Sequence, residues 1–304
     1  MGEYKFGKAA FIGAGKIASS LLPAVTRTGI EVIQVISSSL ASAKELAERN
    51  NITHYADNIG CLSDAADIVF LSVPDSQIQG TADEISKLNI SFSGKLFIHL
   101  SGAKDIHDLN GLKHKSASIA SIHIMQSFPD KVPVDLAGCP AAIETDSHDV
   151  QSFLYELCKK MKLLPFFIKP EEKVYYHMMG VFALNFISAN FYNSDQLRKK
   201  TGEDIPEAKE LLANAAFHTL KNIEQKGAIE ALSGPIERGD IATIKHHIES
   251  IKNDKLLLFN YISSSLTLIN VAGDKKSISQ KSYEEMKTYL ENELKLVCSN
   301  YIHS

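Results

Sequence analysis

Basic charge is not in excess in this sequence of 304 residues. Lysine and arginine total 32 against 36 aspartates and glutamates, which gives a formal net charge of −4. Proteins that bind nucleic acid through their charge usually carry a clear basic excess. The composition therefore predicts no nucleic-acid partner.

Cysteine is also scarce and scattered. The four cysteines are Cys61, Cys139, Cys158 and Cys298. They form neither a paired metal-binding spacing nor a compact disulfide framework, so we expect no metal site and a reducing compartment. The apolar stretch near the start of MGEYKFGKAAFIGAG is too short for a secretory signal. These features favour a cytoplasmic protein.

No long apolar run is free of polar residues. The two most apolar stretches, 174–191 and 256–272, are interrupted by histidine, asparagine and serine. A membrane-spanning helix needs about 20 mainly apolar residues, and polar side chains inside it are costly. We therefore predict that both stretches are buried helices and that the protein has no membrane partner.

Several catalytic signatures are absent from the sequence. It contains no HExxH or CxxC motif, no GxSxG elbow and no GxxxxGK[ST] phosphate loop. His246 and His247 would face different ways on a helix. Acyl transfer, nucleotide hydrolysis and metal-dependent chemistry are therefore not expected.

The first half of the chain alternates short apolar runs with helical patterns, which is typical of a parallel sheet covered by helices. A later helix and strand, 150–161 and 164–168, end this part. The strand-like runs are 9–12, 32–36, 68–72, 96–100 and 119–122, and the connecting helices are 17–28, 41–50 and 78–88.

The second half changes character after Lys169, where Pro170 marks the start of a nearly all-helical region. Two of its helices are apolar on more than one stripe, which calls for burial on several sides and predicts a homodimer. The expected helices are 172–198, 206–226, 241–252, 254–270 and 279–298.

A glycine motif lies between the first expected strand and its helix. Gly13, Gly15 and Ala18 follow the pattern G-x-G-x-x-G/A. In this context the glycines allow a tight turn and the close approach of a pyrophosphate to the helix N-terminus. We predict a dinucleotide-binding segment at Gly13, Ala14, Gly15, Lys16 and Ile17. The fold class is then α/β: a Rossmann-type, mostly parallel sheet over 1–169, followed by an all-helical domain over 170–304.

The second strand ends in Ser37, Ser38 and Ser39, where an NAD-preferring site usually presents a carboxylate to the ribose. Hydroxyl groups without a carboxylate favour NADP, although NAD stays possible because the nearest downstream base is Lys44 and not an arginine. Alternatively, the serines cap the next helix.

Polar residues also follow the later strands, at the edge of the sheet where ligands bind. The fourth strand leads into Ser72, Val73, Pro74 and Asp75, which we assign to cofactor binding. His99, Ser101, Gly102 and His123 follow or end the next strands. A strand-end histidine is either part of the scaffold or catalytic, and both interpretations stay open.

Six segments together carry a family resemblance: GAGKIA, SVPD, HLSGA, SIHIMQSF, YHMMGVFALNF and LSGPIERGD. The sequence resembles Rossmann-like proteins with the domain-of-unknown-function family 2520, which are related to pyrroline-5-carboxylate reductase and the deazaflavin-dependent NADP reductases. The resemblance implies an N-terminal NADP-binding domain and a helical domain that commonly dimerises. One departure is Ile124, where the family has proline after the histidine.

The late segment matches the family at Gly234, Pro235, Arg238, Gly239 and Asp240. A helix stop and an N-cap at Asp240 explain most of it. These two features do not explain Arg238. It either binds a carboxylate or phosphate, or fixes the turn through a salt bridge.

The first long helix of the second half carries a polar stripe of His177, Asn185, Ser188 and Tyr192. The lysine that β-hydroxyacid dehydrogenases place four residues before their asparagine is replaced here by Val181. The stripe is either a hydrogen-bonded seam or faces the nicotinamide.

In the second case His177 is the proton donor and Asn185 orients the substrate, with Ser101, His123 and Arg238 as further catalytic candidates. The sequence thus predicts an NADP-dependent oxidoreductase that reduces a small C=N or C=O substrate between its domains. The alternatives are a non-catalytic NADP sensor and a hydroxy-acid dehydrogenase.

Overall fold

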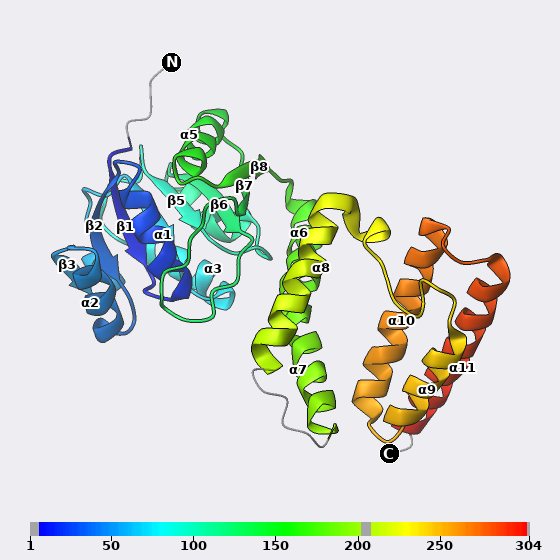
Figure 1. The fold of residues 1–304 in the computed structure, drawn as a ribbon. Helices are drawn as coiled ribbons and strands as arrows, with labels where there is room; N and C mark the ends of the chain where they lie inside the picture. The colour runs from blue at the N-terminus through cyan, green and yellow to red at the C-terminus, as the bar shows by residue number, and fades with distance from the viewer. Residues whose placement is uncertain (1–5, 202–207, 303–304) are drawn as a thin grey trace. The chain divides into compact units, whose positions relative to one another are not determined.

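The computed structural model describes residues 6–201 and 208–302. Its internal contacts divide the chain into two compact units, Met1–Ser188 and Ala189–Ser304. The division lies beyond Pro170, so the first helix after the sheet belongs with the sheet unit. Figure 1 labels the elements of both units.

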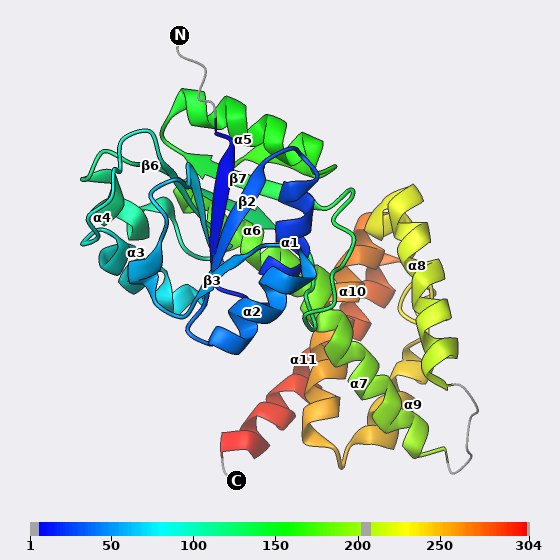
Figure 2. The same ribbon diagram turned by 90° about the vertical axis from the view of Figure 1, so that its left-hand side faces the viewer.

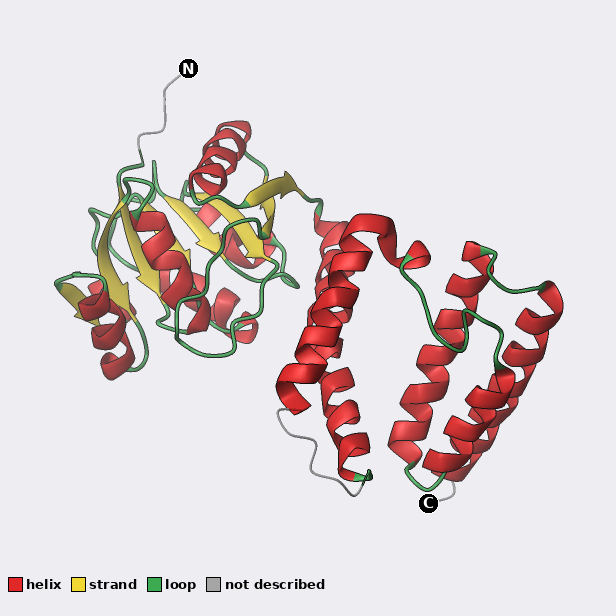
Figure 3. Ribbon diagram, in the orientation of Figure 1, coloured by secondary structure: helices red, strands yellow, loops and turns green. Residues whose placement is uncertain are grey.

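The first unit is built on one eight-stranded sheet in the order β3-β2-β1-β4-β5-β6-β7-β8, with its strands drawn as yellow arrows in Figure 3. All neighbouring pairs are parallel except β6 and β7, which pair antiparallel. The strands are β1 (Lys8–Ile12), β2 (Glu31–Ile36), β3 (His54–Ala56), β4 (Ile68–Leu71), β5 (Leu96–His99), β6 (Ser118–Ile124), β7 (Pro140–Thr145) and β8 (Leu164–Phe167).

Helices cover both faces of this sheet, as Figure 2 shows. Phe11 faces a core that includes residues of α1, α2 and α5, and Ile12 faces a core that includes residues of α3 and α4. Burial on both faces explains why the strands are continuous apolar runs. The helices are α1 (Lys16–Thr26), α2 (Leu40–Arg49), α3 (Ile78–Ile85), α4 (Asn110–Lys113), α5 (His148–Lys160) and α6 (Lys173–Gly180).

The predicted fold class is confirmed, and two strands are added to it. β3 has only three residues, too few to show a pattern. β7 reads PAAIET, in which two alanines and a buried Glu144 hide the strand signal. The sheet is therefore longer than predicted.

The second unit is helical, and its described residues bury one core between α9, α10 and α11. Asp240 and Asp254 cap α9 and α10 through the backbone N–H groups of Thr243 and Leu257, so the predicted cap at Asp240 is found. The helices are α7 (Phe186–Lys199), α8 (Ala208–Glu230), α9 (Ile241–Ile251), α10 (Lys255–Lys275) and α11 (Gln280–Ile302), and residues 206–207 of the expected helix 206–226 lie outside the described residues.

The expected single helix 172–198 is interrupted. A π-helical segment, Val181–Asn185, separates α6 from α7. A π turn holds an additional residue, so it shifts which positions share a face, and such turns are common at functional sites. A period of 3.6 residues therefore does not describe the stripe from His177 to Asn185.

The stretches 174–191 and 256–272 are helical, as expected, but each is only partly buried in the single chain. Val174 is 53% exposed, Phe182 64% and Leu256 61%. By length and hydropathy α10 also passes as a candidate membrane span, with a third of its most apolar window buried. Since its buried residues pack with α9 and α11, one such helix is weak evidence for a membrane span.

Candidate functional site

The turn after β1 fits against the end of β4 only because residue 13 is glycine. Gly13 has φ +103°, and a Cβ there would lie 2.1 Å from the carbonyl oxygen of Ser72. The backbone N–H of Ser72 in turn donates to the Ile12 carbonyl at 2.7 Å. The first glycine of the motif therefore joins two neighbouring strand ends.

The second glycine leaves space above the N-terminus of α1. Gly15 is the N-cap residue of α1, and no described side chain caps this helix. A Cβ at Gly15 would meet only the Ser72 carbonyl oxygen, at 4.0 Å. The first-turn N–H groups of α1 are thus available to a negatively charged group.

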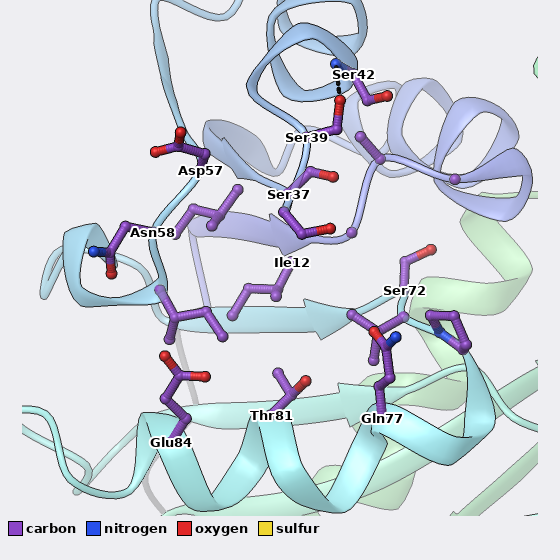
Figure 4. A pocket seen from close by; sticks show the side chains of 18 of the residues that line it. Ile12, Ser37, Ser39, Ser42, Asp57, Asn58, Ser72, Gln77, Thr81 and Glu84 are labelled. Carbon is purple, nitrogen blue, oxygen red and sulfur yellow. Dashed lines mark hydrogen bonds between the residues drawn. The ribbon is translucent and has the colours of Figure 1, made fainter.

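A cavity of about 680 Å³ opens beside these glycines. Figure 4 shows Ser37, Ser39 and Ser72 around it, with Asp57 on a separate segment beyond the end of β3. The predicted cofactor residues on this cavity are Gly13, Ala14, Gly15, Ser37, Ser38, Ser39, Ser72, Val73 and Pro74.

A second cavity, of about 420 Å³, adjoins the first, since both are lined by Gly15 and Val73. Lys16, Ile17 and Asp75 lie here. The two cavities together follow the carboxyl edge of the sheet, where open α/β sheets bind ligands. Their adjoining positions and the glycine turn fit a dinucleotide with its pyrophosphate over α1.

One of the three serines after β2 has the alternative role of capping the next helix. The Ser39 hydroxyl accepts a hydrogen bond from the backbone N–H of Ser42 at 3.3 Å, so Ser39 caps α2. Ser37 is half-buried and Ser38 is exposed on the cavity. Lys44 does not line the cavity; its partner is Glu48, at 3.7 Å. Lys131, far away in the sequence, lines it instead.

Two histidines meet at the end of β6. The ring centroids of His123 and His177 are 5.8 Å apart, and the Tyr176 ring lies edge-on to His123 at 5.4 Å. The His123 ring also packs over Gly102, where a Cβ would lie 2.7 Å from ring atoms. The structure thus brings together Gly102, His123 and His177, which the sequence analysis had singled out.

The electrostatics keep His123 neutral. Burial, helped by the nearby His177 and Lys173, lowers its pKa to about 4. Its Nδ1 atom is buried, and no described residue pairs with it. Buried polar groups are normally hydrogen-bonded, so this nitrogen is an exception, and His123 lines neither of the two cavities.

A buried ion pair lies behind the histidines, and the sequence interpretation missed it. Lys173 Nζ donates to Glu144 Oε2 at 2.8 Å and to Ser121 Oγ at 2.9 Å. Lys173 and Glu144 are only 2% and 3% exposed. The helix pattern gave Lys173 no special status, although a lysine preceding His177 by one helical turn was a signal that it shares that face.

His99 and Ser101 have structural contacts. Burial lowers the pKa of His99 to about 3, and its Nε2 lies 3.1 Å from the Asp105 carbonyl oxygen. The Ser101 hydroxyl accepts from the backbone N–H groups of Ala103 and Lys104. These contacts favour the scaffold interpretation for His99, and a catalytic role for Ser101 stays a prediction.

The remaining candidates lie outside this cluster of contacts. Asn185, Ser188 and Tyr192 are exposed, so the polar stripe is not a buried seam within the chain. Arg238 is exposed in the second unit and lies near Asp240, whose pKa is lowered mainly by hydrogen bonds from Thr243. Their catalytic roles stay predictions. Among the described residues no group of three or more His, Cys, Asp or Glu side chains could hold a metal.

This combination of sheet, glycine turn and helical second unit defines a class of Rossmann-type two-unit proteins. Residues 8–101 match the family model described as NADP oxidoreductase, coenzyme F420-dependent. Residues 139–266 match the domain of unknown function DUF2520. The resemblance predicted from the sequence is confirmed, and the first match includes β1 through β5 and their strand ends.

Solved structures share the fold over nearly the whole chain. A candidate NADP oxidoreductase from Bacteroides fragilis has 22% identity and a TM-score of 0.72, covering 87% of this chain and 98% of its own. A Thermotoga maritima protein has 22% identity and a TM-score of 0.67, covering 88% and 99%. Plasmodium falciparum pyrroline carboxylate reductase with NADP bound has 14% identity and a TM-score of 0.59, covering 94% and 99%. No curated protein sequence matches the chain.

Proposed function

We propose that the protein is a cytoplasmic NADP-dependent oxidoreductase that reduces a small C=N or C=O substrate. The observation that carries this proposal is the pair of adjoining cavities at the carboxyl edge of the sheet. One begins at a glycine turn and serine hydroxyls, and the other includes Asp75, whose charge acts on the half-buried His123. The matched NADP oxidoreductase model supports the same assignment.

Different residues along the two cavities would hold different parts of the cofactor. The first turn of α1 would hold the pyrophosphate, and Ser37 and Ser38 would hold the adenosine ribose. The second cavity, lined by Ile17, Val73 and Leu100, would hold the nicotinamide. Bound NADPH supplies a hydride, so the protein needs to provide orientation, a proton and exclusion of water.

We consider His177 and His123 for the two remaining roles, proton donation and substrate orientation. His177 is exposed, and histidine is the side chain that most often serves as a general acid or base in enzymes. His123 stays neutral, because burial lowers its pKa to about 4. We assign proton donation to His177 and substrate orientation to His123, with Asn185 as a second orienting group. The placement of the substrate between the two units stays a prediction.

A calorimetric titration tests the cofactor assignment. We expect NADPH to bind more tightly than NADH, because Ser37 to Ser39 present hydroxyls and no carboxylate. Gly15→Asp should abolish binding of both, since it places a negative charge at the pyrophosphate position. Equal or tighter NADH binding would contradict the NADP assignment. Binding of neither cofactor by the wild type would overturn the proposed function.

Turnover tests the histidine assignment. NADPH oxidation should be measured against a set of cyclic imines and 2-oxo acids. His177→Gln and Asn185→Ala should remove turnover while cofactor affinity stays nearly intact. His114→Gln, at an exposed position on the sheet unit, is the matched control and should change neither. Tight NADPH binding without any turnover would favour the sensor alternative.

We also propose that the protein is a homodimer formed through its helical second half. No described residue of α7 or α8 is buried, and Tyr175, Phe182 and Phe217 are each more than 60% exposed. Apolar surface of this extent is typical of an interface. Light scattering at micromolar concentration should give the mass of two chains, and a stable monomer would contradict the proposal.

A further inference from the structure

The connection 125–139 between β6 and β7 reaches helix α2 and returns. Its backbone is fixed on two helices: Val134 N donates to Ser20 Oγ of α1 at 3.1 Å, and Arg49 Nη1 of α2 donates to the Lys131 carbonyl at 3.2 Å. Figures 1 and 2 show this loop passing along α1. The loop therefore passes α2, where the side chain of Arg49, the last residue of the helix, binds the Lys131 carbonyl.

The Lys131 ammonium lies among the groups that follow β2. Its Nζ donates to Ser42 Oγ at 3.0 Å, although 89 residues separate the two in the sequence. Ser42 is itself joined to Ser39 through the helix cap. Lys131, Ser39 and Ser42 line the same cavity as the glycine turn. A cation thus stands where the ribose of a dinucleotide is normally recognised.

Around Lys131 itself, cations outnumber carboxylates, although the acidic residues Asp57 and Glu84 also line this cavity. Glu45 lies 3.7 Å from Lys131 Nζ, but its other oxygen is bound by Arg49 at 2.6 Å. Two cations therefore face one carboxylate. An ammonium group has three donors, and Ser42 takes only one at good hydrogen-bond distance. Lys131 keeps donor capacity for an oxyanion that enters the cavity.

We propose that Lys131 is the residue that recognises the 2′-phosphate of NADP, together with the hydroxyls of Ser38, Ser39 and Ser42. This inference rests on the proposed function, since it names the group that makes the same cavity selective. The loop 125–139, which carries Lys131, begins directly after His123 and Ile124 of β6. The residue that selects the cofactor and the histidine at the sheet edge therefore lie on consecutive segments.

Cofactor titrations of charge-altered variants test the inference. Lys131→Gln should weaken NADPH binding about 10- to 100-fold, since a charge-assisted contact to phosphate is worth roughly 1.5–3 kcal/mol. NADH binding should change less than twofold. Lys131→Arg should recover most of the NADPH affinity. Lys44→Gln removes the same charge from a neighbouring exposed position on α2 and should leave both affinities unchanged.

The outcomes separate this inference from the proposed function. An unchanged NADPH affinity in Lys131→Gln would overturn the role of Lys131 and leave the oxidoreductase proposal standing. An equal loss for NADH and NADPH would also overturn it, because the lysine would then only hold the loop in place. A wild type that binds neither dinucleotide would overturn both proposals together.

Discussion

Two parts of the molecule differ in how completely they bury their apolar side chains and pair their buried charges. The sheet unit buries apolar residues on both faces of the sheet and pairs its buried charges, as Lys173 does with Glu144. In the helical unit, α9, α10 and α11 form a core, while α8 exposes Leu211, Phe217 and Leu220. The sheet with α1 to α5 has the character of a complete domain, whereas α6 of the same unit, with Tyr175 70% exposed, and α8 have that of one side of an interface.

This difference has a consequence for function. A complete domain can hold a preformed cofactor site, and both cavities lie within the sheet unit. Exposed apolar helices are instead available for association or for packing that changes with assembly. Substitutions in the two units should therefore have very different costs, which the following changes measure.

The largest expected effect is on Gly13. Gly13→Ala forces a Cβ to within 2.1 Å of the Ser72 carbonyl oxygen at a φ of +103°, so the strand ends must move apart. We expect a loss of about 3 kcal/mol or more in the free energy of unfolding, measured with urea. Gly15→Ala is the matched control, because its Cβ has space; its stability should change by less than about 1 kcal/mol. Equal costs for the two variants would contradict this account of the turn.

The parts of the fold that follow periodic patterns were predictable from sequence. The apolar runs gave β1, β2, β4 and β5, and the GAGKIA segment located the turn and α1. β7 was not predictable, because its alanines and Glu144 resemble no strand pattern. The π segment was not predictable either, because the search for helical patterns assumes a period of 3.6 residues.

The second-largest effect is expected at the buried ion pair. Lys173→Met leaves the Glu144 carboxylate buried at 3% exposure without its cation. Breaking such a pair costs about 3–5 kcal/mol, which urea unfolding would measure. The double variant Glu144→Leu with Lys173→Met should recover most of the loss, since no charge then stays buried. Lys44→Met breaks an exposed pair with Glu48 and should cost less than about 1 kcal/mol. A similar small cost for Lys173→Met would show that water reaches the pair.

The candidate site was predictable in part, and its missing members share one physical cause. Residues at strand ends converge on one edge by topology, so His123 and Ser72 could be placed from the sequence. Lys173, Glu144 and Lys131 enter through contacts between segments far apart in the chain. A single sequence carries no periodic signal for such contacts.

The pH dependence of stability should be moderate and should arise in the sheet unit. Burial lowers the pKa of His99 to about 3 and that of His123 to about 4, against about 6.5 for histidine in an unfolded chain. Between these values the unfolded state binds protons that the folded state does not. The stabilisation is therefore complete above about pH 6.5 and is lost as the pH falls toward 4.

From pH 7 to pH 5 each histidine should reduce the free energy of unfolding by about 2 kcal/mol. Urea unfolding across this range, above the titration of ordinary carboxylates, would measure the slope. His123→Asn should roughly halve the slope. His114→Gln, at an exposed position, should leave it unchanged. A wild type with constant stability from pH 7 to 5 would mean that both rings bind protons in the folded chain as they do in the unfolded chain.

The smallest effect on the stability of the single chain is expected from the exposed apolar residues of the helical unit. Leu220 of α8 is 49% exposed, whereas Leu21 of α1 is fully buried. Leu21→Ala should cost about 2–5 kcal/mol at any protein concentration. Leu220→Ala should cost less than about 0.5 kcal/mol at the lowest concentration at which unfolding can be followed. If the proposed dimer forms through α8, the melting temperature of the wild type should rise with protein concentration, and that of Leu220→Ala should rise less. A concentration-independent melting temperature in both proteins, with the light-scattering mass of one chain, would show that α8 stays exposed and that the difference between the two units has another cause.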